Sequence, residues 1–268
     1  MHTHLFPPLT TFFFIIMAIT LIKFPPPLHA IDDALYLACS APFACSGIHN
    51  LQGYPFWGSN RPEYCGHPGF ELNCSGDAPQ LYITDRYYRV LEINYSSRIL
   101  KVVRADYWNT ICPDSYANST INFTLFSFSP DTTNVKLFYD CNSMYLIPEQ
   151  PDSFRFICTR NGNSFTNYYK RSNEDCVYNN VEVPVMQSAV SGNLSTQAAL
   201  SEAIDGGFTL VWNANDSRCD GCEVSGGQCG FNTSTNAFVC HCKTGSSPLT
   251  CESTRSKHSS HFANFLII

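Results

Sequence analysis

The sequence predicts a mainly β, disulfide-rich fold of two small extracellular modules, the second with one short helix and an EGF-like cysteine knot. Three observations lead to this fold class. The chain of 268 residues holds 14 cysteines, and all of them lie downstream of an apolar leader. Short runs of β-branched and aromatic residues recur between turn signals. Charged residues make up only 14% of the chain, against 14 Tyr and 20 Phe, a balance that suits sheets better than helices.

The leader, residues 1–30, is a predicted secretory signal peptide. Its apolar core at residues 11–23 is shorter than the roughly 20 residues that span a bilayer. Residues 25–27 are prolines that break a helix, and Ala30 offers a small residue for cleavage. Behind a secretory signal, an even number of cysteines predicts disulfides. The candidates are Cys39, Cys45, Cys65, Cys74, Cys112, Cys141, Cys158, Cys176, Cys219, Cys222, Cys229, Cys240, Cys242 and Cys251.

Glycosylation sequons indicate the same secretory route. Asn-x-Ser/Thr without an intervening proline occurs across the whole mature chain, and each site that is used must face solvent. The predicted N-glycosylation sites are Asn73, Asn94, Asn118, Asn122, Asn193, Asn215 and Asn232.

Residues 81–105 carry the pattern of an antiparallel meander. The runs 81–84, 87–93 and 99–105 are rich in β-branched and aromatic residues, and residues 84–86 and 94–98 between them have turn composition. Further short strands are predicted at residues 122–128, 135–139, 154–158 and 181–185.

One helix is predicted, at residues 196–204. Ser195 is the expected N-cap and Gly206 and Gly207 end the helix. Phe208 and Trp212 belong to an alternating strand that follows. Residues 246–260 are polar and without periodicity, which predicts a linker or tail over residues 246–268.

Residues 36–113 contain a set of motifs in a fixed order. They are Cys39-Ser40-Ala41-Pro42-Phe43-Ala44-Cys45, Gly53-Tyr54-Pro55-Phe56-Trp57, Arg61 to Cys74 with Cys65-Gly66-His67-Pro68-Gly69 at its centre, Tyr88-Arg89-Val90-Leu91 and Cys112-Pro113. This set closely resembles the galacturonan-binding module at the N-terminus of plant wall-associated and leaf-rust-resistance-type receptor-like kinases. One departure is Cys45-Ser46-Gly47, where the family has Cys-Gly.

A second resemblance covers residues 141–245. Its motifs are Gly207-Phe208-Thr209-Leu210-Val211-Trp212, the run from Cys219 to Gly230, and Phe238-Val239-Cys240-His241-Cys242. They are similar to the C-terminal module of wall-associated kinases. The resulting division is a signal peptide at 1–30, a galacturonan-binding module at 31–113, connecting strands at 114–140, the C-terminal module at 141–245 and a tail at 246–268.

The spacing of Cys219, Cys222, Cys240 and Cys242 also fits a four-thiolate zinc site. Behind a signal peptide the same spacing favours a small disulfide knot, with Gly226-Gly227 as its tight turn. No metal and no cofactor is therefore predicted. Spacing alone leaves the pairing of the cysteines open.

Two groups of residues are candidates for binding a polyuronate. Aromatic rings pack against the apolar faces of sugars, and an Arg fork matches a carboxylate bidentately. A meander places side chains of neighbouring strands side by side, so the basic residues are expected to form one strip. The alternatives are core aromatic residues and a solvated strand face. The predicted ligand-binding residues are Tyr54, Trp57, Arg61, Arg86, Arg89, Arg98, Lys101 and Arg104.

Charge and motifs argue against several functions. The formal net charge of −6 at pH 7 disfavours nucleic acid as a partner. The chain contains no Gly-rich ATP loop, His-Arg-Asp or Asp-Phe-Gly motif, and no spacing singles out a carboxylate pair for glycoside hydrolysis among Asp77, Asp85, Glu92 and Asp106. The chain is therefore predicted not to be an enzyme.

The resemblance implies a kinase-less receptor ectodomain that binds pectic polysaccharide (galacturonan) at the plant cell wall, with the C-terminal module as a stalk. It implies secretion to the apoplast, and a plasma-membrane location for a longer form that carries a transmembrane helix. A membrane co-receptor is a second expected partner. Two alternatives stay open: a peptide-recognising ectodomain of a truncated receptor-like Ser/Thr kinase, and an extracellular enzyme acting on wall polymers.

Overall fold

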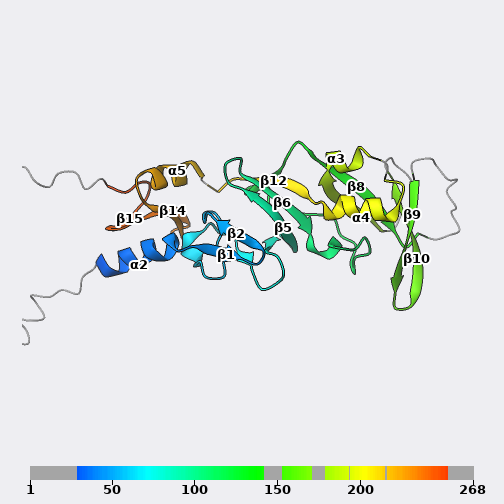
Figure 1. The fold of residues 1–268 in the computed structure, drawn as a ribbon, viewed down its shortest axis with the longest axis horizontal. Helices are drawn as coiled ribbons and strands as arrows, with labels where there is room; N and C mark the ends of the chain where they lie inside the picture. Colours follow the sequence, from blue (N-terminus) through cyan, green and yellow to red (C-terminus); the bar gives the residue numbers. More distant parts are fainter. Residues whose placement is uncertain (1–28, 142–152, 171–178, 193, 215, 253–268) are drawn as a thin grey trace, which may run out of the picture.

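The computed structural model describes residues 29–141, 153–170, 179–192, 194–214 and 216–252. They form an elongated molecule whose strands fall into four antiparallel sheets (Figure 1). The N-terminal segments and the cysteine-rich C-terminal segments lie side by side at one end, and a four-stranded sheet with two helices forms the other. The predicted mainly β, disulfide-rich fold class is confirmed.

The N-terminal end consists of a helix and a small hairpin. Helix α2 (His29–Ser40) leads into β1 (Phe43–Cys45) and β2 (Ile48–Leu51), and the 3-10 helix η1 (Glu63–Cys65) follows. Disulfides Cys39–Cys65 and Cys45–Cys74 tie α2 and β1 to the following loops. Helix α2 was not predicted from the sequence, and it starts at His29, just before the expected cleavage point. The rest of the predicted leader, residues 1–28, lies outside the described residues.

A six-stranded sheet forms the centre of the molecule. It contains β3 (Leu72–Asn73), β4 (Gln80–Ile83), β5 (Arg86–Asn94), β6 (Ile99–Arg104), β12 (Phe208–Trp212) and β7 (Phe126–Phe128), in the order β3-β4-β5-β6-β12-β7. The 3-10 helix η2 (Ala105–Tyr107) follows β6. The predicted meander is confirmed as β4, β5 and β6.

Strand β12 comes from the predicted C-terminal module but pairs with strands that precede that module. Leu210 lies opposite Leu100 of β6 on one side and Phe128 of β7 on the other. Leu210 and Leu100 are fully buried, as is Phe56 of the N-terminal loop, which meets the Trp212 ring of β12 at 5.3 Å. The two predicted modules therefore share a sheet and a hydrophobic core.

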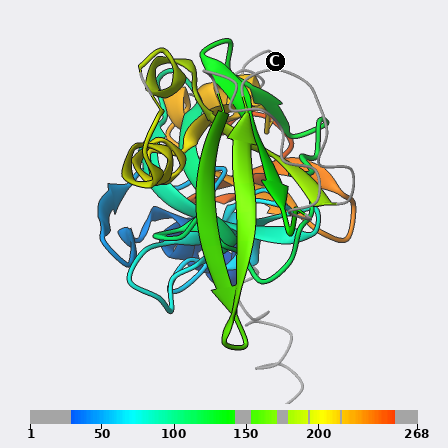
Figure 2. The ribbon, with the colours of Figure 1, turned by 90° about the vertical axis from the view of Figure 1, so that its right-hand side faces the viewer.

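The far end is a second sheet, in the order β11-β8-β10-β9. Its strands are β8 (Thr132–Tyr139), β9 (Ser153–Arg160), β10 (Asn163–Lys170) and β11 (Asn179–Met186). The long β9–β10 hairpin faces the viewer in Figure 2. A core of alternating strand residues, including Val135, Leu137, Val181 and Val183, lies between this sheet and a helix.

That helix is α4 (Gln197–Asp205), preceded by the single turn α3 (Gln187–Val190). α4 buries Leu200, Ala203 and Ile204. The predicted helix is confirmed, but its N-cap is Thr196, whose hydroxyl accepts a hydrogen bond from the Ala199 amide at 3.1 Å. The prediction of Ser195 as the cap was wrong by one residue. The helix ends at the expected glycine, Gly206.

The C-terminal cystine segment consists of α5 (Asp216–Val224), β13 (Gln228–Asn232), β14 (Ala237–Cys242) and β15 (Gly245–Ser247). It packs against the N-terminal end: the Phe238 ring meets the Tyr54 ring at 5.8 Å, and His241 Nε2 lies 3.2 Å from the Tyr64 carbonyl oxygen. The cystine segment therefore lies against the N-terminal module (Figure 1), and the stalk role of the C-terminal module stays a prediction.

The described cysteines are disulfide-bonded, as predicted. Besides the two N-terminal bridges, the pairs are Cys112–Cys158, Cys219–Cys229, Cys222–Cys240 and Cys242–Cys251. Cys141 is also disulfide-bonded, and Cys176 lies outside the described residues. The four-thiolate zinc alternative is wrong, because all four of its sulfurs are in bridges. The predicted glycine turn is present: Gly226 has φ 82°, and a Cβ on Gly227 would collide with bridge sulfurs.

Other elements depart from the sequence-based expectation. The strand predicted at 122–128 contracts to β7, because Asn122 begins a turn closed by hydrogen bonds to its backbone and side chain. β10 and α5 were not predicted. Among the described residues, no helix is long and apolar enough to cross a membrane.

Candidate functional site

Two of the predicted ligand-binding arginines are buried. Arg61 is 5% exposed and donates hydrogen bonds to the carbonyl oxygens of Cys39 (2.6 Å) and Cys65 (3.1 Å), and burial lowers its pKa. Arg104 is 1% exposed and contacts both carboxylate oxygens of Asp106, at 3.0 and 2.7 Å. Both guanidinium groups hold the fold together and are withdrawn from any ligand at the surface, so the prediction is corrected for these two residues.

The predicted aromatic platform is not present as an open surface. Tyr54 is buried and its hydroxyl donates to the carbonyl oxygen of Ala214, and desolvation raises the pKa of this tyrosine. Trp57 is half-buried, and its indole N–H donates to the His67 carbonyl oxygen at 3.1 Å. Tyr54 is therefore a core residue, and the Trp57 side chain packs within its own loop.

Arg86 and Arg98 form ion pairs at opposite ends of the β5–β6 hairpin, where the Arg86 side chain is largely covered and that of Arg98 is exposed. Arg86 contacts Asp85 (3.1 Å) and Asp106 (3.7 Å). Arg98 contacts two carboxylates of α5, Asp216 (3.7 Å) and Asp220 (3.6 Å). The fold thus brings carboxylates from other parts of the chain to both arginines, Asp106 to Arg86 and two residues of α5 to Arg98.

The pleat of the sheet separates the remaining basic residues. Arg104 lies opposite Tyr88, both fully buried on the inner face, whereas Arg89 lies opposite Val103 on the other face. Lys101 is two residues from Val103 and so shares the outer face with Arg89. The basic residues expected to form one strip are therefore divided among two faces and a turn. They are Arg86, Arg89, Arg98, Lys101 and Arg104.

Arg89 is the arginine best placed for a ligand on the outer face. It forms a bidentate pair with Asp77, with nitrogen–oxygen distances of 2.6 and 2.8 Å, and its guanidinium stacks on the Trp108 ring at 4.4 Å. The Asp77 side chain is 78% exposed, and the hydrogen bond from Arg89 holds the pKa of its carboxyl below the usual value. Arg89 is thus preorganised for a carboxylate, and its present partner is open to solvent.

The same outer face carries an exposed pair of tyrosines, Tyr82 and Tyr87. They lie directly opposite each other on β4 and β5, with ring centroids 4.9 Å apart, and are 51% and 47% exposed. Gln80 and Arg89 form the next outward pair along the same two strands. We call the surface formed by Tyr82, Tyr87, Gln80 and Arg89 the tyrosine shelf.

A hollow of about 470 Å³ opens beside the tyrosine shelf. Tyr82, Tyr87 and Gln80 form one side of it, and Glu71, Asn73 and Ser75 contribute polar groups from the loop and strand that precede β4. Apolar ring faces next to hydrogen-bonding groups are the combination that sugars require. The shelf and its hollow are therefore the candidate carbohydrate site.

Tyr82 and Tyr87 are not among the ligand-binding residues predicted from the sequence, although the sequence holds a local signal for them. Leu81 and Ile83 flank Tyr82, so strand alternation turns Tyr82 outward when these neighbours are buried. A two-residue turn at Thr84 and Asp85 then sets Tyr82 opposite Tyr87. The predicted turn spanned residues 84–86, a length that leaves the register of the hairpin undetermined.

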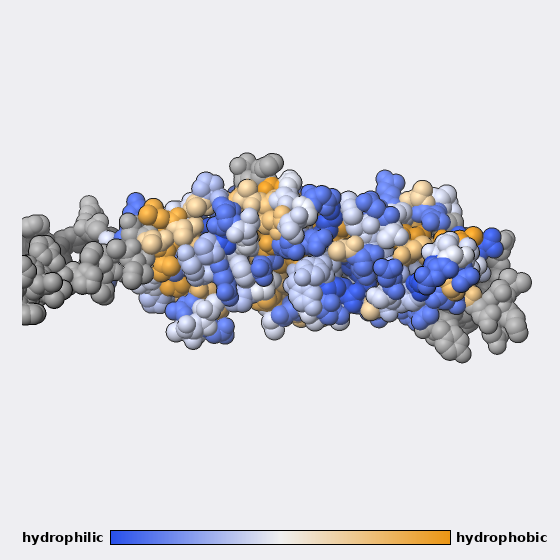
Figure 3. Space-filling view, turned by 90° about the horizontal axis from the view of Figure 1, so that it is seen from below, coloured by the Kyte–Doolittle hydropathy of each residue, from blue (hydrophilic) through white to orange (hydrophobic). Residues whose placement is uncertain are grey.

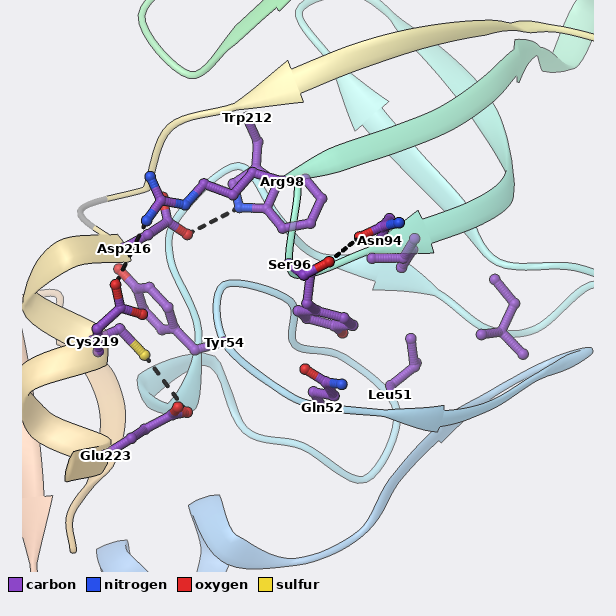
Figure 4. A pocket seen from close by; sticks show the side chains of 14 residues that line it. Leu51, Gln52, Tyr54, Asn94, Ser96, Arg98, Trp212, Asp216, Cys219 and Glu223 are labelled. Atoms are coloured by element: carbon purple, nitrogen blue, oxygen red, sulfur yellow. Dashed lines mark hydrogen bonds and ion pairs between the residues drawn. The ribbon is translucent and has the colours of Figure 1, made fainter.

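A second pocket, of about 550 Å³, lies at the seam between the N-terminal loops and α5 (Figure 4). We call it the seam pocket. Leu51, Tyr54 and Trp212 line its apolar side. The indole N–H of Trp212 donates to Asp216 at 3.0 Å, and Arg98 reaches the same carboxylate from the β5–β6 turn (Figure 4).

The seam pocket has an acidic rim. Asp216, Asp220 and Glu223 all line the pocket, and Arg98 pairs with the two aspartates among them. Burial, followed by the charge of Asp220, raises the pKa of Glu223. This arrangement repels a polyuronate. The seam pocket is consequently a poor candidate for galacturonan and a better one for a ligand with a basic group.

The five predicted glycosylation sites that are described are exposed, as the prediction requires. They are Asn73, Asn94, Asn118, Asn122 and Asn232, whereas Asn193 and Asn215 lie outside the described residues. Asn94 lines the seam pocket, and Asn73 lines the hollow beside the tyrosine shelf. Their use remains a prediction.

Apolar residues are unevenly distributed on the surface. On the face shown in Figure 3 they gather toward the end that carries α2 and the cystine segment, and hydrophilic residues prevail toward the far sheet. Leu37 of α2, Val224 of α5 and Leu249 are 57%, 90% and 51% exposed.

Comparison with known proteins identifies the two parts of the chain. Residues 39–104 match the family model of the wall-associated receptor kinase galacturonan-binding module, and residues 140–245 match that of the wall-associated receptor kinase C-terminal module. The class of protein is therefore a wall-associated receptor ectodomain with disulfide-rich β modules.

The relatives specify the class further. The leaf rust 10 disease-resistance locus receptor-like protein kinase-like 2.1 of Arabidopsis thaliana is 34% identical over 220 residues, which cover 76% of this chain and 34% of that protein. The kinase-like 1.3 protein of the same series is 31% identical over 213 residues, covering 78% of this chain and 29% of that protein. The chain thus corresponds to the ectodomain of leaf-rust-10-type receptor-like kinases and spans about a third of these relatives. No solved structure matches it.

Proposed function

We propose that this chain binds de-esterified galacturonan through the tyrosine shelf, as the extracellular recognition part of a wall-associated receptor. The observation that carries the proposal is the exposed, directly paired Tyr82 and Tyr87 beside a polar hollow. Both tyrosines lie within the segment that matches the galacturonan-binding family model.

The two parts of the shelf suit the two properties of a uronic acid polymer. The tyrosine rings offer apolar surface to sugar ring faces. Arg89 lies two residues from Tyr87 on the same face, about 7 Å along the strand, and presents a fork for a carboxylate. Galacturonate binding there requires the uronate to replace the exposed carboxylate of Asp77.

The test is retention on immobilised polygalacturonate. Replacing both Tyr82 and Tyr87 by Ala is expected to weaken binding about tenfold, which corresponds to about 1.4 kcal/mol, within the range of aromatic contacts. The matched control is Phe123→Ala, which removes another exposed aromatic ring, 72% exposed, remote in sequence from the shelf. Equal retention of the double variant and wild type would refute the proposal.

Methyl-esterified pectin and a salt series complete this experiment. Because Arg89 is expected to pair with a carboxylate of the polymer, the amount of protein retained should fall as the polymer is esterified and as the salt concentration rises. Indifference to both would contradict a role for Arg89. Shortening of the polymer during incubation would instead support the alternative of a wall-polymer enzyme; we assign no catalytic role to the two modules.

A second candidate function is recognition of a basic peptide by the seam pocket. It is favoured by the lining of the pocket, where three carboxylates accompany one arginine, which pairs with two of them, beside an apolar side. Binding of lysine- or arginine-containing peptides that is lost on replacing Asp220 and Glu223 by their amides would support it. A co-receptor that presents such a segment would use the same surface.

A further inference from the structure

We infer that an N-glycan on Asn73 covers the tyrosine shelf and controls access to it. The inference rests on the proposed function in one respect, the identity of the ligand that is excluded. The cover itself follows from the position of Asn73 in the strand next to the shelf.

Asn73 lies on the correct face and at the correct distance. It pairs with Gln80 in the β3–β4 ladder, so its side chain shares the outer face with Gln80 and with Tyr82 two residues further on. Such diagonal neighbours lie about 7–8 Å apart, within reach of long side chains. Asn73 also lines the hollow together with both tyrosines. The first sugars of a glycan on Asn73 therefore reach the two rings.

The local bonds of Asn73 leave its amide nitrogen available. Its Oδ1 atom accepts hydrogen bonds from the Ser75 backbone amide (3.0 Å) and hydroxyl (2.6 Å). Its Nδ2 atom, which carries the glycan of a used sequon, makes no hydrogen bond to any described residue. The side chain is exposed, and Cys74 anchors the strand through its bridge to Cys45.

Covalent attachment gives the glycan an advantage over free galacturonan in binding to the tyrosine shelf. A tethered sugar has an effective concentration in the millimolar range near its attachment point, and the aromatic pair offers it the same stacking surface as a free polymer. The glycan therefore occupies the hollow unless galacturonan binds more tightly. A chain glycosylated at Asn73 is the low-affinity form, and a chain without that glycan is the open form.

The experiment compares wild type with Ser75→Ala and Asn73→Gln, produced in a host that glycosylates. Either change removes the sequon, while Ser75→Thr keeps it. Asn232→Gln removes an exposed sequon far from Asn73 in the sequence and serves as a control. Peptide mass spectrometry measures occupancy at Asn73. Nitration by tetranitromethane, mapped to peptides containing Tyr82 and Tyr87, measures access to the rings without any pectin.

We expect occupied Asn73 in wild type and Ser75→Thr, with nitration of the two tyrosines several-fold slower than in Ser75→Ala and Asn73→Gln. We also expect several-fold stronger polygalacturonate retention by these two open variants, and no change for Asn232→Gln. An unoccupied Asn73, or equal nitration in all forms, overturns the inference. Slower nitration in the occupied forms without polygalacturonate retention by any form supports the cover and refutes the proposed galacturonan function instead.

Discussion

The ion pair of Arg89 determines whether its guanidinium is available to bind a ligand. Its bidentate partner Asp77 is 12 residues away and is almost fully in solvent, while the guanidinium is largely covered and stacked on Trp108. Because the Asp77 side chain is 78% exposed, its carboxylate can return to solvent at a small cost in free energy when a ligand carboxylate takes its place. In the galacturonan complex that we propose, Asp77 is therefore expected to compete with the uronate for Arg89.

This competition gives a prediction for Asp77→Asn. Removing the carboxylate frees the Arg89 fork, so retention on polygalacturonate is expected to rise several-fold at low salt, whereas Arg89→Gln is expected to lower it. The double variant should behave like Arg89→Gln alone, because Asp77 acts only through Arg89. Binding isotherms of the four proteins test this. An unchanged affinity of Asp77→Asn would contradict the competition.

The buried Arg61 has the opposite character. It joins Cys39 at the end of α2 to Cys65 in η1 through two carbonyl hydrogen bonds, and Gly53 is required beside it because a Cβ there would lie 2.7 Å from its guanidinium. A residue in this position affects binding only through the fold.

At the scale of elements, helix α4 shows that the sequence alone does not determine which of two adjacent residues is the N-cap. Ser195 and Thr196 are adjacent hydroxyl residues, and both are chemically competent N-caps. The backbone decides between them: Thr196 has extended dihedrals, φ −127° and ψ 152°, and its side chain reaches the Ala199 amide.

We therefore expect Thr196→Ala to lower the free energy of unfolding by about 1 kcal/mol. Ser195→Ala is the control, and because it also removes the Asn193 sequon, all three proteins are produced without N-glycosylation. Its expected effect is within about 0.5 kcal/mol, as for ordinary surface substitutions. Urea unfolding followed by circular dichroism measures both. Equal effects of the two substitutions would show that the cap is shared.

β12 is the element with the greatest consequence for the architecture. It arrives from a distant part of the chain, fills the place between β6 and β7, and contributes the buried Phe208, Leu210 and Trp212 to the central core. Without it, β6 would become an edge strand, and its backbone groups and apolar side chains would face water.

A chain that ends at residue 141 is accordingly expected not to fold, although it contains the whole segment that matches the galacturonan-binding family model. The expected observations are the loss of a cooperative thermal transition and binding of a hydrophobic dye. The full chain under the same conditions is the control. Cooperative unfolding of the shortened chain would show that the N-terminal module is independent of β12.

At the scale of the whole molecule, exposed carboxylates link stability to pH. Hydrogen bonds from Arg89, Thr120 and Thr209 lower the pKa of Asp77, Asp85 and Asp131, respectively. A carboxyl with a lowered pKa in the folded state binds its proton more weakly there than in the unfolded chain. Its stabilising effect is present above the unfolded pKa, near 3.8, and is lost as the pH falls through the folded value.

We expect the melting temperature to fall as the pH is lowered from about 5 to 3, through the ordinary range of Asp pKa values. Asp131→Asn is expected to flatten part of this dependence, because it removes the carboxylate that accepts the 2.6 Å hydrogen bond from Thr209 of β12. Calorimetry at several pH values tests this. An identical pH dependence in the variant would exclude Asp131 as a contributor.

The division between local and long-range information explains which predictions held. The sequence by itself determined the mainly β class, the meander, the disulfide-rich character and the exposure of the described sequons, because alternation, turns and cysteine spacing are local patterns. The sequence also shows the family resemblance, because the motifs of the family occur in it in the expected order. The tertiary structure alone decided which cations are free, since Asp77, Asp216 and Asp220 reach Arg89 and Arg98 only through folding.

Only the tertiary structure shows that the two modules share one sheet and where the candidate site lies. β12 joins the central sheet across more than 100 residues of chain, and the hairpin register places Tyr82 beside Tyr87. The pairing of β12 with β6 and the register of the β4–β5 hairpin are both stabilised by burying side chains on a shared face of the sheet. Because this burial needs both strands, the sequence of either strand alone does not determine the pairing.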